Sequence, residues 1–92
     1  MKSNALRIND NDNVAIAAEV IKQGDPVVVN GELVCKTTED IEPGHKVALF
    51  PIANGEIVFR YGEPIVQVIR DISQGEWVHV HNTRPVPGDL QE

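Results

Sequence analysis

The chain has 92 residues and a formal net charge of −6, without any run of Lys or Arg residues. Binding to a nucleic-acid backbone needs clustered cations, so this composition argues against a nucleic-acid partner. No apolar run reaches the ~20 residues of a membrane span, and the first residues lack the apolar stretch of a signal peptide. We therefore expect one cytoplasmic domain with a single small core and no membrane partner.

Cys35 is the single cysteine of the sequence. An intrachain disulfide and a cysteine-based zinc site are therefore excluded. Because Cys35 lies in an apolar, strand-like run, we interpret it as a buried, inert thiol.

The first elements in chain order are a short strand and a polar turn. Residues 5–8 alternate as a strand does, and residues 9–13 are all Asn or Asp. The polar run lacks the Gly and the distal Glu of an EF-hand loop, so we predict a turn held by side-chain to backbone hydrogen bonds. Asp12 or Asn13 can cap a short helix over residues 14–20, and an Ala-rich strand is the alternative there.

Four segments follow the pattern Ile-x-x-Gly-polar. They are residues 21–25, 41–45, 52–56 and 72–76, and the apolar runs that follow them are residues 26–29, 46–49, 57–59 and 77–80. The pattern predicts a turn whose Gly has a positive φ, an Ile in the core, and a strand that begins at once. The separation between Gly24 and Gly44 is the same as that between Gly55 and Gly75. This equal spacing indicates either two halves related by a pseudo-two-fold or a coincidence.

Two further turns complete the prediction of the fold. Asn30-Gly31 predicts a tight hairpin, and residues 61–64 predict a turn or bulge before a strand over residues 65–69. The sequence therefore predicts an all-β domain over residues 1–84, with at most short helices. Residues 85–92 are rich in Pro and Gly and are expected to form a tail or linker.

The candidate site is the stretch from Trp77 to Arg84. If residues 77–81 form a strand, Trp77, His79 and His81 share one face and the two valines the other. Two imidazoles side by side are not typical of a core face. The run continues into the polar side chains of residues 82–84 and stops at Pro85. Clustered polar groups at the end of a strand predict a functional site.

Four motifs, taken together, resemble a known family. They are residues 12–16, 44–49, 60–65 and 75–84, and they are similar to the amino-terminal SAF domain of the altronate and galactarate dehydratases. The likeness covers nearly the whole chain and implies a compact SAF-type β-clip fold. The motif from His79 to Arg84 is closest to the altronate branch and to the small subunits of sulfolactate sulfo-lyase, whereas residues 54–63 are closer to the galactarate branch. Val66 stands where relatives usually have Gly.

The resemblance implies removal of water from a sugar acid to give a 2-keto-3-deoxy product, with a divalent metal such as iron or manganese in the complete enzyme. Such a reaction needs a base for the α proton and groups that hold the carboxylate and the leaving hydroxide. A domain of this size seldom encloses a pocket of ~300 Å³ or more. We therefore expect a small subunit or amino-terminal domain, inactive alone, whose site is completed by a large catalytic subunit or domain.

Two alternatives stay open beside the hydro-lyase. The chain can be a non-catalytic SAF module that binds a carbohydrate or another protein, or the small subunit of a sulfolactate sulfo-lyase. Association of the chain with copies of itself is left open as well.

The residues expected to serve the site, which the resemblance implies, are His79, His81 and His45 as catalytic groups, Asn82, Arg84 and Lys46 in substrate binding, and His79 with His81 as metal ligands. On a flat strand the two imidazoles lie roughly 7 Å apart, so one metal can be shared only if the backbone bends. Otherwise one imidazole binds metal or substrate while the other acts as acid or base.

For these and neighbouring residues, a purely structural role is kept as an alternative. His45 can simply hold its turn, and Lys46 and Arg60 can be solvated charges. Tyr61 and Trp77 are interpreted as core residues.

Overall fold

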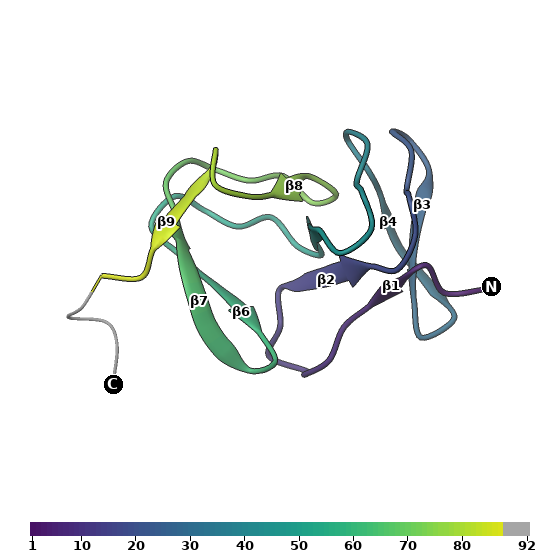
Figure 1. The fold of residues 1–92 in the computed structure, drawn as a ribbon, viewed down its shortest axis with the longest axis horizontal. Helices are drawn as coiled ribbons and strands as arrows, with labels where there is room; N and C mark the ends of the chain where they lie inside the picture. The colour runs from purple at the N-terminus through teal and green to yellow at the C-terminus, as the bar shows by residue number, and fades with distance from the viewer. Residues whose placement is uncertain (88–92) are drawn as a thin grey trace.

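The computed structural model describes residues 1–87, which form short antiparallel strands and no helix (Figure 1). The strands are β1 (Ala5–Leu6), β2 (Val14–Ala17), β3 (Pro26–Val29), β4 (Glu32–Lys36), β5 (Lys46–Ala48), β6 (Ile57–Arg60), β7 (Glu63–Val68), β8 (Trp77–Val78) and β9 (Thr83–Pro85). The all-β prediction is therefore confirmed.

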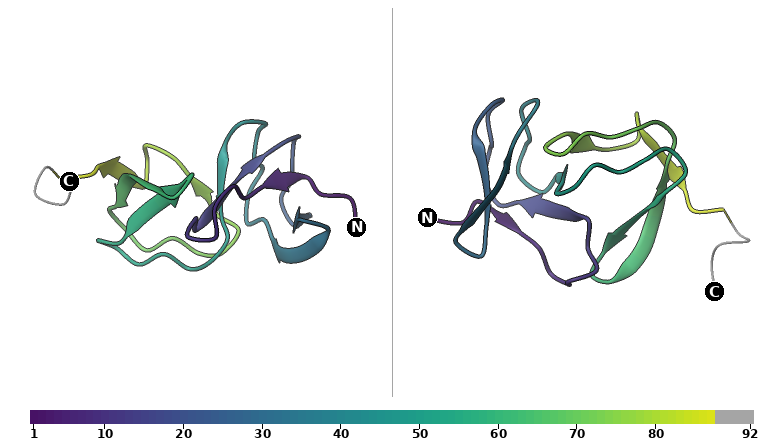
Figure 2. Two further views of the ribbon diagram at one scale, coloured as in Figure 1. Left: turned by 90° about the horizontal axis from the view of Figure 1, so that it is seen from below. Right: turned by 180° about the vertical axis from the view of Figure 1, so that it is seen from behind.

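The strands make three sheets, with orders β1-β2-β5-β8, β3-β4 and β6-β7-β9. The four-stranded sheet lies in the middle of the molecule, with the β3-β4 hairpin towards the N-terminal end and the β6-β7-β9 sheet at the opposite end (Figures 1 and 2). The predicted tail begins later than expected, because Pro85 belongs to β9 and Val86 is buried. The rest of that prediction, residues 88–92, lies outside the described residues.

The Ile-x-x-Gly turns have the conformation that the sequence predicts. All four Ile side chains are at most 2% exposed, and the φ angles are 85° at Gly24, 83° at Gly44, 93° at Gly55 and 87° at Gly75. The turns also meet in pairs, because Ile21 bridges to Ile41 and Ile52 bridges to Ile72. Each pair of turns therefore closes the base of one hairpin.

The two hairpins match in detail. Asn30-Gly31 joins β3 to β4 and Tyr61-Gly62 joins β6 to β7, and all four residues have positive φ. Each hairpin has a bulge in its second strand, at Val34 in β4 and at Ile65 in β7, and an Asn side chain bonds to the first strand opposite the bulge. Asn4 accepts from the Val28 amide and donates to the Pro26 carbonyl, while Asn13 does the same for Phe59 and Ile57. The chain therefore contains two halves of the same design, as one of the two interpretations expects.

The polar run at residues 9–13 is a turn, as predicted. The Asn9 side chain accepts from the Asn11 amide, and the Asp12 carboxylate accepts from the Asn9 amide. The alternative of a helix after this turn is wrong, because residues 14–17 form β2. Asp12 and Asn13 direct their side chains to the β6-β7 hairpin instead of to a first helical turn.

Two apolar clusters, instead of the single small core that was expected, pack on opposite faces of the central sheet. One, with Ala15 and Val47, fills the space towards β3-β4, and the other, with Val14 and Ala48, fills the space towards β6-β7. Cys35 packs half-buried against the first cluster, and burial raises the pKa of its thiol, which agrees with an inert role.

The predicted strand over residues 77–80 is too long. β8 ends at Val78, the chain turns from His79 to Asn82, and Val80 is 76% exposed instead of sharing a buried face. The side-chain oxygen of Asn82 accepts from the His79 amide at 2.9 Å, and the Asn82 amide donates to the His79 carbonyl at 3.1 Å. These local bonds use the groups with which a longer strand would continue the sheet.

Candidate functional site

Four rings gather at one edge of the central sheet, and we call them the ring cluster: His45, Trp77, His79 and His81. The His45 and Trp77 ring centroids are 5.3 Å apart with planes 3° apart, and those of Trp77 and His79 are 4.6 Å apart at 13°. His81 is tilted by 43° against Trp77 at 5.1 Å. The prediction that Trp77, His79 and His81 lie together is therefore confirmed, although a turn rather than a continuous strand brings His81 to the cluster.

The strand register explains how two distant segments meet in the ring cluster. β5 and β8 are antiparallel, with Val47 opposite Trp77 and Lys46 opposite Val78. Continuing this register by one residue places His45 opposite His79, at the point where β8 turns away. The observed centroid distance of 5.5 Å between these two imidazoles fits that position. His45 also holds its turn, because its amide donates to the Glu42 carbonyl.

Trp77 combines the core role that the sequence predicts with a role in the site. One side of the residue packs against the first apolar cluster, while its ring contacts all three imidazoles. Its indole Nε1 is buried without a hydrogen-bond partner among the described residues. Tyr61 differs from its predicted core position, because it lies at the tip of the β6-β7 hairpin and is 54% exposed.

Asn82 holds the turn that carries His79 and His81. It is 0% exposed, and its Nδ2 donates to the Trp77 carbonyl at 2.8 Å and to Glu76 at 3.3 Å. Thr83 adds a bond from its hydroxyl to the His79 carbonyl at 2.7 Å. These contacts support a positioning role for Asn82, and its predicted contact with substrate stays a prediction.

The environment of His79 favours its neutral form. Partial burial lowers the pKa of His79, and the nearby positive charges of His45, Lys46 and His81 lower it further. A neutral imidazole at neutral pH has a free lone pair on one nitrogen, so it can accept a proton from a substrate.

Lys46, which directly follows His45, and Arg60, which ends β6, are two half-buried cations. Burial lowers the pKa of the Lys46 ammonium, and the charge of Arg60 lowers it further. The sequence interpretation of Arg60 as a solvated charge is therefore incomplete. In the sequence, Arg60 directly precedes the Tyr61-Gly62 turn within the motif at residues 60–65. That position was the available indication that Arg60 belongs to the site.

Arg84 lies on β9, apart from the stacked rings. Its guanidinium donates from Nε and Nη2 to the Gln67 side chain at 2.8 and 2.6 Å, across the β7-β9 pair. Its predicted role in holding a carboxylate stays a prediction.

The candidate ligand side chains of the described residues do not by themselves fit a divalent metal. Within residues 1–87, no group of three or more His, Cys, Asp or Glu side chains is arranged to hold one. Catalytic metals usually take about three protein ligands, and His79 and His81 provide two imidazoles. Any metal at this edge needs further ligands from outside the described residues.

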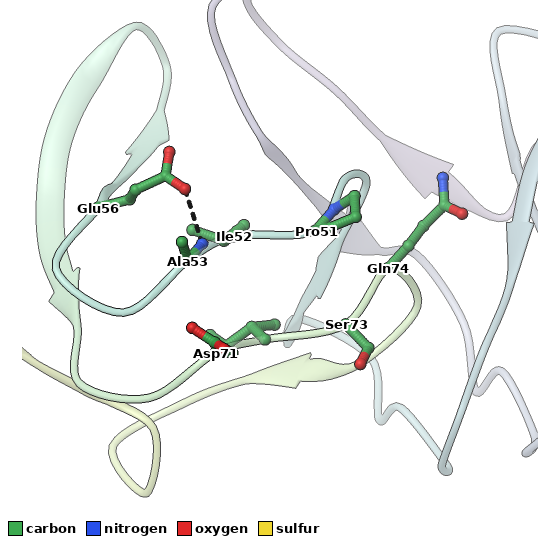
Figure 3. A pocket seen from close by; sticks show the side chains of 8 residues that line it. Pro51, Ile52, Ala53, Glu56, Asp71, Ser73 and Gln74 are labelled. Atoms are coloured by element: carbon green, nitrogen blue, oxygen red, sulfur yellow. Dashed lines mark hydrogen bonds between the residues drawn. The ribbon is translucent and has the colours of Figure 1, made fainter.

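A pocket of about 480 Å³ lies elsewhere, beside the bridge between Ile52 and Ile72 (Figure 3). Its two carboxylates serve the local turns, because Glu56 accepts from the Ala53 amide and Asp71 accepts from the Asn54 amide. None of its lining residues belongs to the ring cluster. The described part of the chain also contains no helix long and apolar enough to cross a membrane.

Comparisons with known proteins agree with the motifs. Residues 3–85 match the family model of the altronate/galactarate dehydratase SAF domain. Over 95% of its length the chain is 40% identical to altronate dehydratase from Escherichia coli, and over 94% it is 37% identical to altronate dehydratase from Bacillus subtilis. In each of these relatives the matched region is 17% of the protein, so the chain spans about a sixth of their length.

A separate-subunit relative is similar over part of the chain. The alpha subunit of (2R)-sulfolactate sulfo-lyase from Chromohalobacter salexigens is 46% identical over 45% of this chain and 44% of the subunit. The family match covers far more of the sequence, including all nine described strands. The chain belongs to the family of altronate/galactarate dehydratase SAF domains.

Proposed function

We propose that this chain is the small subunit or amino-terminal domain of a sugar-acid hydro-lyase, and that it contributes His79, His81 and His45 to an active site completed by a large catalytic subunit or domain. The proposal rests chiefly on the ring cluster, where three imidazoles from two distant segments meet at one edge of the sheet.

Each imidazole has a role that its position supports. His79, whose environment favours the neutral form, takes the proton α to the substrate carboxylate. His45 stacks beside it and fixes the orientation of the rings together with Trp77. His81, which is exposed on the turn, reaches outward and delivers a proton to the leaving hydroxide.

The shape of the domain supports completion by a partner. The pocket beside the Ile52-Ile72 bridge and a smaller one of about 160 Å³ beside Asn30 have no histidine in their lining. The imidazoles lie at a surface, where water competes for every polar contact with a substrate. A catalytic domain that covers the ring cluster excludes this water and supplies the remaining walls of the site.

The iron or manganese of the complete enzyme is part of this proposal. A divalent metal bound there would supply Lewis-acid chemistry. Because no group of three or more His, Cys, Asp or Glu side chains within residues 1–87 is arranged to hold it, most of its ligands would come from the catalytic partner, and His79 or His81 would serve either as a ligand or in its acid or base role.

A sulfo-lyase is the second candidate, because part of the chain is similar to the alpha subunit of a sulfolactate sulfo-lyase. That reaction shares the need for a base and differs in the leaving group. The identity of the substrate therefore separates the two candidates.

Co-purification tests the proposal. The tagged chain, or the longer protein that contains it, is purified from its own host, and bound proteins are identified by mass spectrometry. The preparation is then assayed for 2-keto-3-deoxy acid formation from altronate and galactarate, and for sulfite release from sulfolactate. A large partner with turnover of a sugar acid is expected. Recovery of the chain alone and inactive, from cells growing on these acids, would favour a non-catalytic binding module.

A further inference from the structure

Arg60 differs from the other arginines of the described chain in having no anionic or hydrogen-bonding partner. Arg7 donates to the Asp10 and Asp12 carbonyls, Arg70 lies 3.7 Å from Glu76, and Arg84 donates to Gln67. The guanidinium of Arg60 instead lies over the Tyr61 ring, 5.2 Å from its centroid.

The Nε group of Arg60 is buried without an acceptor among residues 1–87. A buried N–H without a partner is unfavourable, and more so when the group is charged. Arg60 directly precedes the positive-φ turn at Tyr61-Gly62, whose amides bind Asp12, so the backbone of this strand end is fixed. The fixed backbone and the Tyr61 ring therefore hold the Arg60 side chain with its Nε away from water.

Lys46 adds a second cation to the same region. It is half-buried on β5, and no carboxylate of the described residues lies within 4.0 Å of its ammonium or of the Arg60 guanidinium. Two cations without a counter-ion repel each other, and the charge of Arg60 lowers the pKa of Lys46. An anion bound between them removes this cost.

We propose that Lys46 and Arg60 together bind a carboxylate, supplied either by the sugar-acid substrate or by an acidic side chain of the catalytic partner. The guanidinium fork matches the two oxygens of a carboxylate, and the ammonium adds a point charge. This inference rests on the proposed function for the identity of the ligand, and it adds Arg60 to the site.

The position of the pair suits a substrate carboxylate in particular. Lys46 begins β5 directly after His45 and is paired with Val78, the residue before His79. The carbon that loses its proton is adjacent to the carboxylate, so a carboxylate held by Lys46 keeps that carbon at the end of β5 next to His45. The same cations then stabilise the negative charge that develops on the carboxylate oxygens.

The test uses the enzyme assembled with its natural catalytic partner and the variants Arg60→Gln, Arg60→Lys and Lys46→Met. Lys22→Met is the matched control, because Lys22 is an exposed cation that pairs with Asp40 on the surface. Thermal melting of each variant shows whether it is folded. Two quantities are then measured: KM and kcat for the active sugar acid, and the affinity of the chain for its partner.

If the substrate supplies the carboxylate, Arg60→Gln and Lys46→Met raise KM by about 10- to 100-fold, Arg60→Lys restores part of the loss, and Lys22→Met has no effect. If the partner supplies it, the same variants weaken assembly by a similar factor while KM stays unchanged. Variants that are folded and change neither quantity by more than about twofold would overturn the inference.

A measurement independent of turnover separates this inference from the proposed function. In the wild-type chain, the NMR signal of the Arg60 Nε–H is followed during titration with galactarate and, as a neutral control, galactitol. A shift with galactarate alone supports the carboxylate site even if no hydro-lyase activity is found. An active enzyme in which the Arg60 signal and the Arg60→Gln kinetics are unchanged would refute the site and leave the proposed function standing.

Discussion

The indole of Trp77 lies parallel to the imidazole of His45, with planes 3° apart and centroids 5.3 Å apart. This pair joins β8 to the turn before β5, and the His79 ring stacks against both members. Trp77 is the single tryptophan of the sequence, so it reports directly on the imidazoles around it. The central claim, that the ring cluster is the chemical centre of the domain, can therefore be tested from both structure and activity.

The lowered pKa of His79 predicts that its imidazole stays neutral to lower pH than an ordinary imidazole does. The NMR titration of His79 should have its midpoint below that of a peptide spanning residues 77–84, because partial burial and the three neighbouring cationic groups disfavour the imidazolium. A midpoint at or above that of the peptide would contradict the environment described for His79.

The same shift predicts how stability depends on pH. Since the folded-state pKa of His79 lies below its unfolded value of about 6.5, its contribution is complete above that pH and is lost as the pH falls through the folded-state pKa. Urea unfolding from about pH 8 to about pH 5 should show a smaller loss of stability for His79→Gln than for the wild type. Equal losses would contradict the assignment.

Asn82→Ala should destabilise the domain by about 2–3 kcal/mol, because it leaves buried backbone groups at His79 and Trp77 without partners. The fluorescence of Trp77 should change as well, since the turn no longer holds the imidazoles against it. Asn54→Ala, on an exposed turn, is the control and should cost less than about 0.5 kcal/mol. Equal costs would show that Asn82 does not hold the turn.

Gly75 and Gly44 occupy equivalent turns with similar φ angles, but their surroundings differ. A Cβ at Gly44 meets no atom within 4 Å, whereas a Cβ at Gly75 collides with the Lys36 carbonyl oxygen. Gly44→Ala should therefore cost about 1–2 kcal/mol through its positive φ alone. Gly75→Ala should cost clearly more or prevent folding, as measured by urea unfolding. Equal costs would exclude the close approach of β4 to this turn.

Asp12 links the polar turn to the second hairpin. Its carboxylate accepts from the amides of Asn9, Tyr61 and Gly62, and burial alone raises the pKa of Asp12 while these amides lower it below the ordinary value. Asp12→Ala should cost about 3 kcal/mol. The exposed Asp10, whose side chain makes none of these bonds, provides the control Asp10→Ala.

The pH dependence of this contribution has a defined sign. Because the folded-state pKa of Asp12 is lowered, its stabilisation is complete above the unfolded value of about 3.9 and is lost as the pH falls through the folded-state value. The difference in unfolding free energy between wild type and Asp12→Ala should shrink in acid. A difference that does not depend on pH would contradict the ionised carboxylate.

Local patterns were sufficient to predict most of the fold. The Ile-x-x-Gly turns and Asn30-Gly31 depend on the conformational freedom of Gly and Asn within a few residues, so the sequence alone identifies them. The end of β8 at Val78 was missed because it depends on the side chain of Asn82, which replaces strand pairing with bonds inside a turn. The alternation of residues 77–81 carries no sign of that competition.

The sequence predicted which residues form the candidate site, but it did not predict how their side chains are arranged. Pairing His79 with His81 required only their spacing, whereas the approach of His45 depends on the register between β5 and β8. Arg60 was missed because its distinguishing property is a buried Nε without a partner, and this appears only once the chain is folded.

The most direct test of the central claim is the turnover of the assembled enzyme with His79→Ala, compared with Val80→Ala as a neighbouring exposed control. We expect His79→Ala to keep the wild-type melting temperature and partner affinity but to lower kcat by about 100-fold or more, as for loss of a general base. Val80→Ala should retain turnover. A folded, assembled His79→Ala enzyme with wild-type kcat would contradict the account.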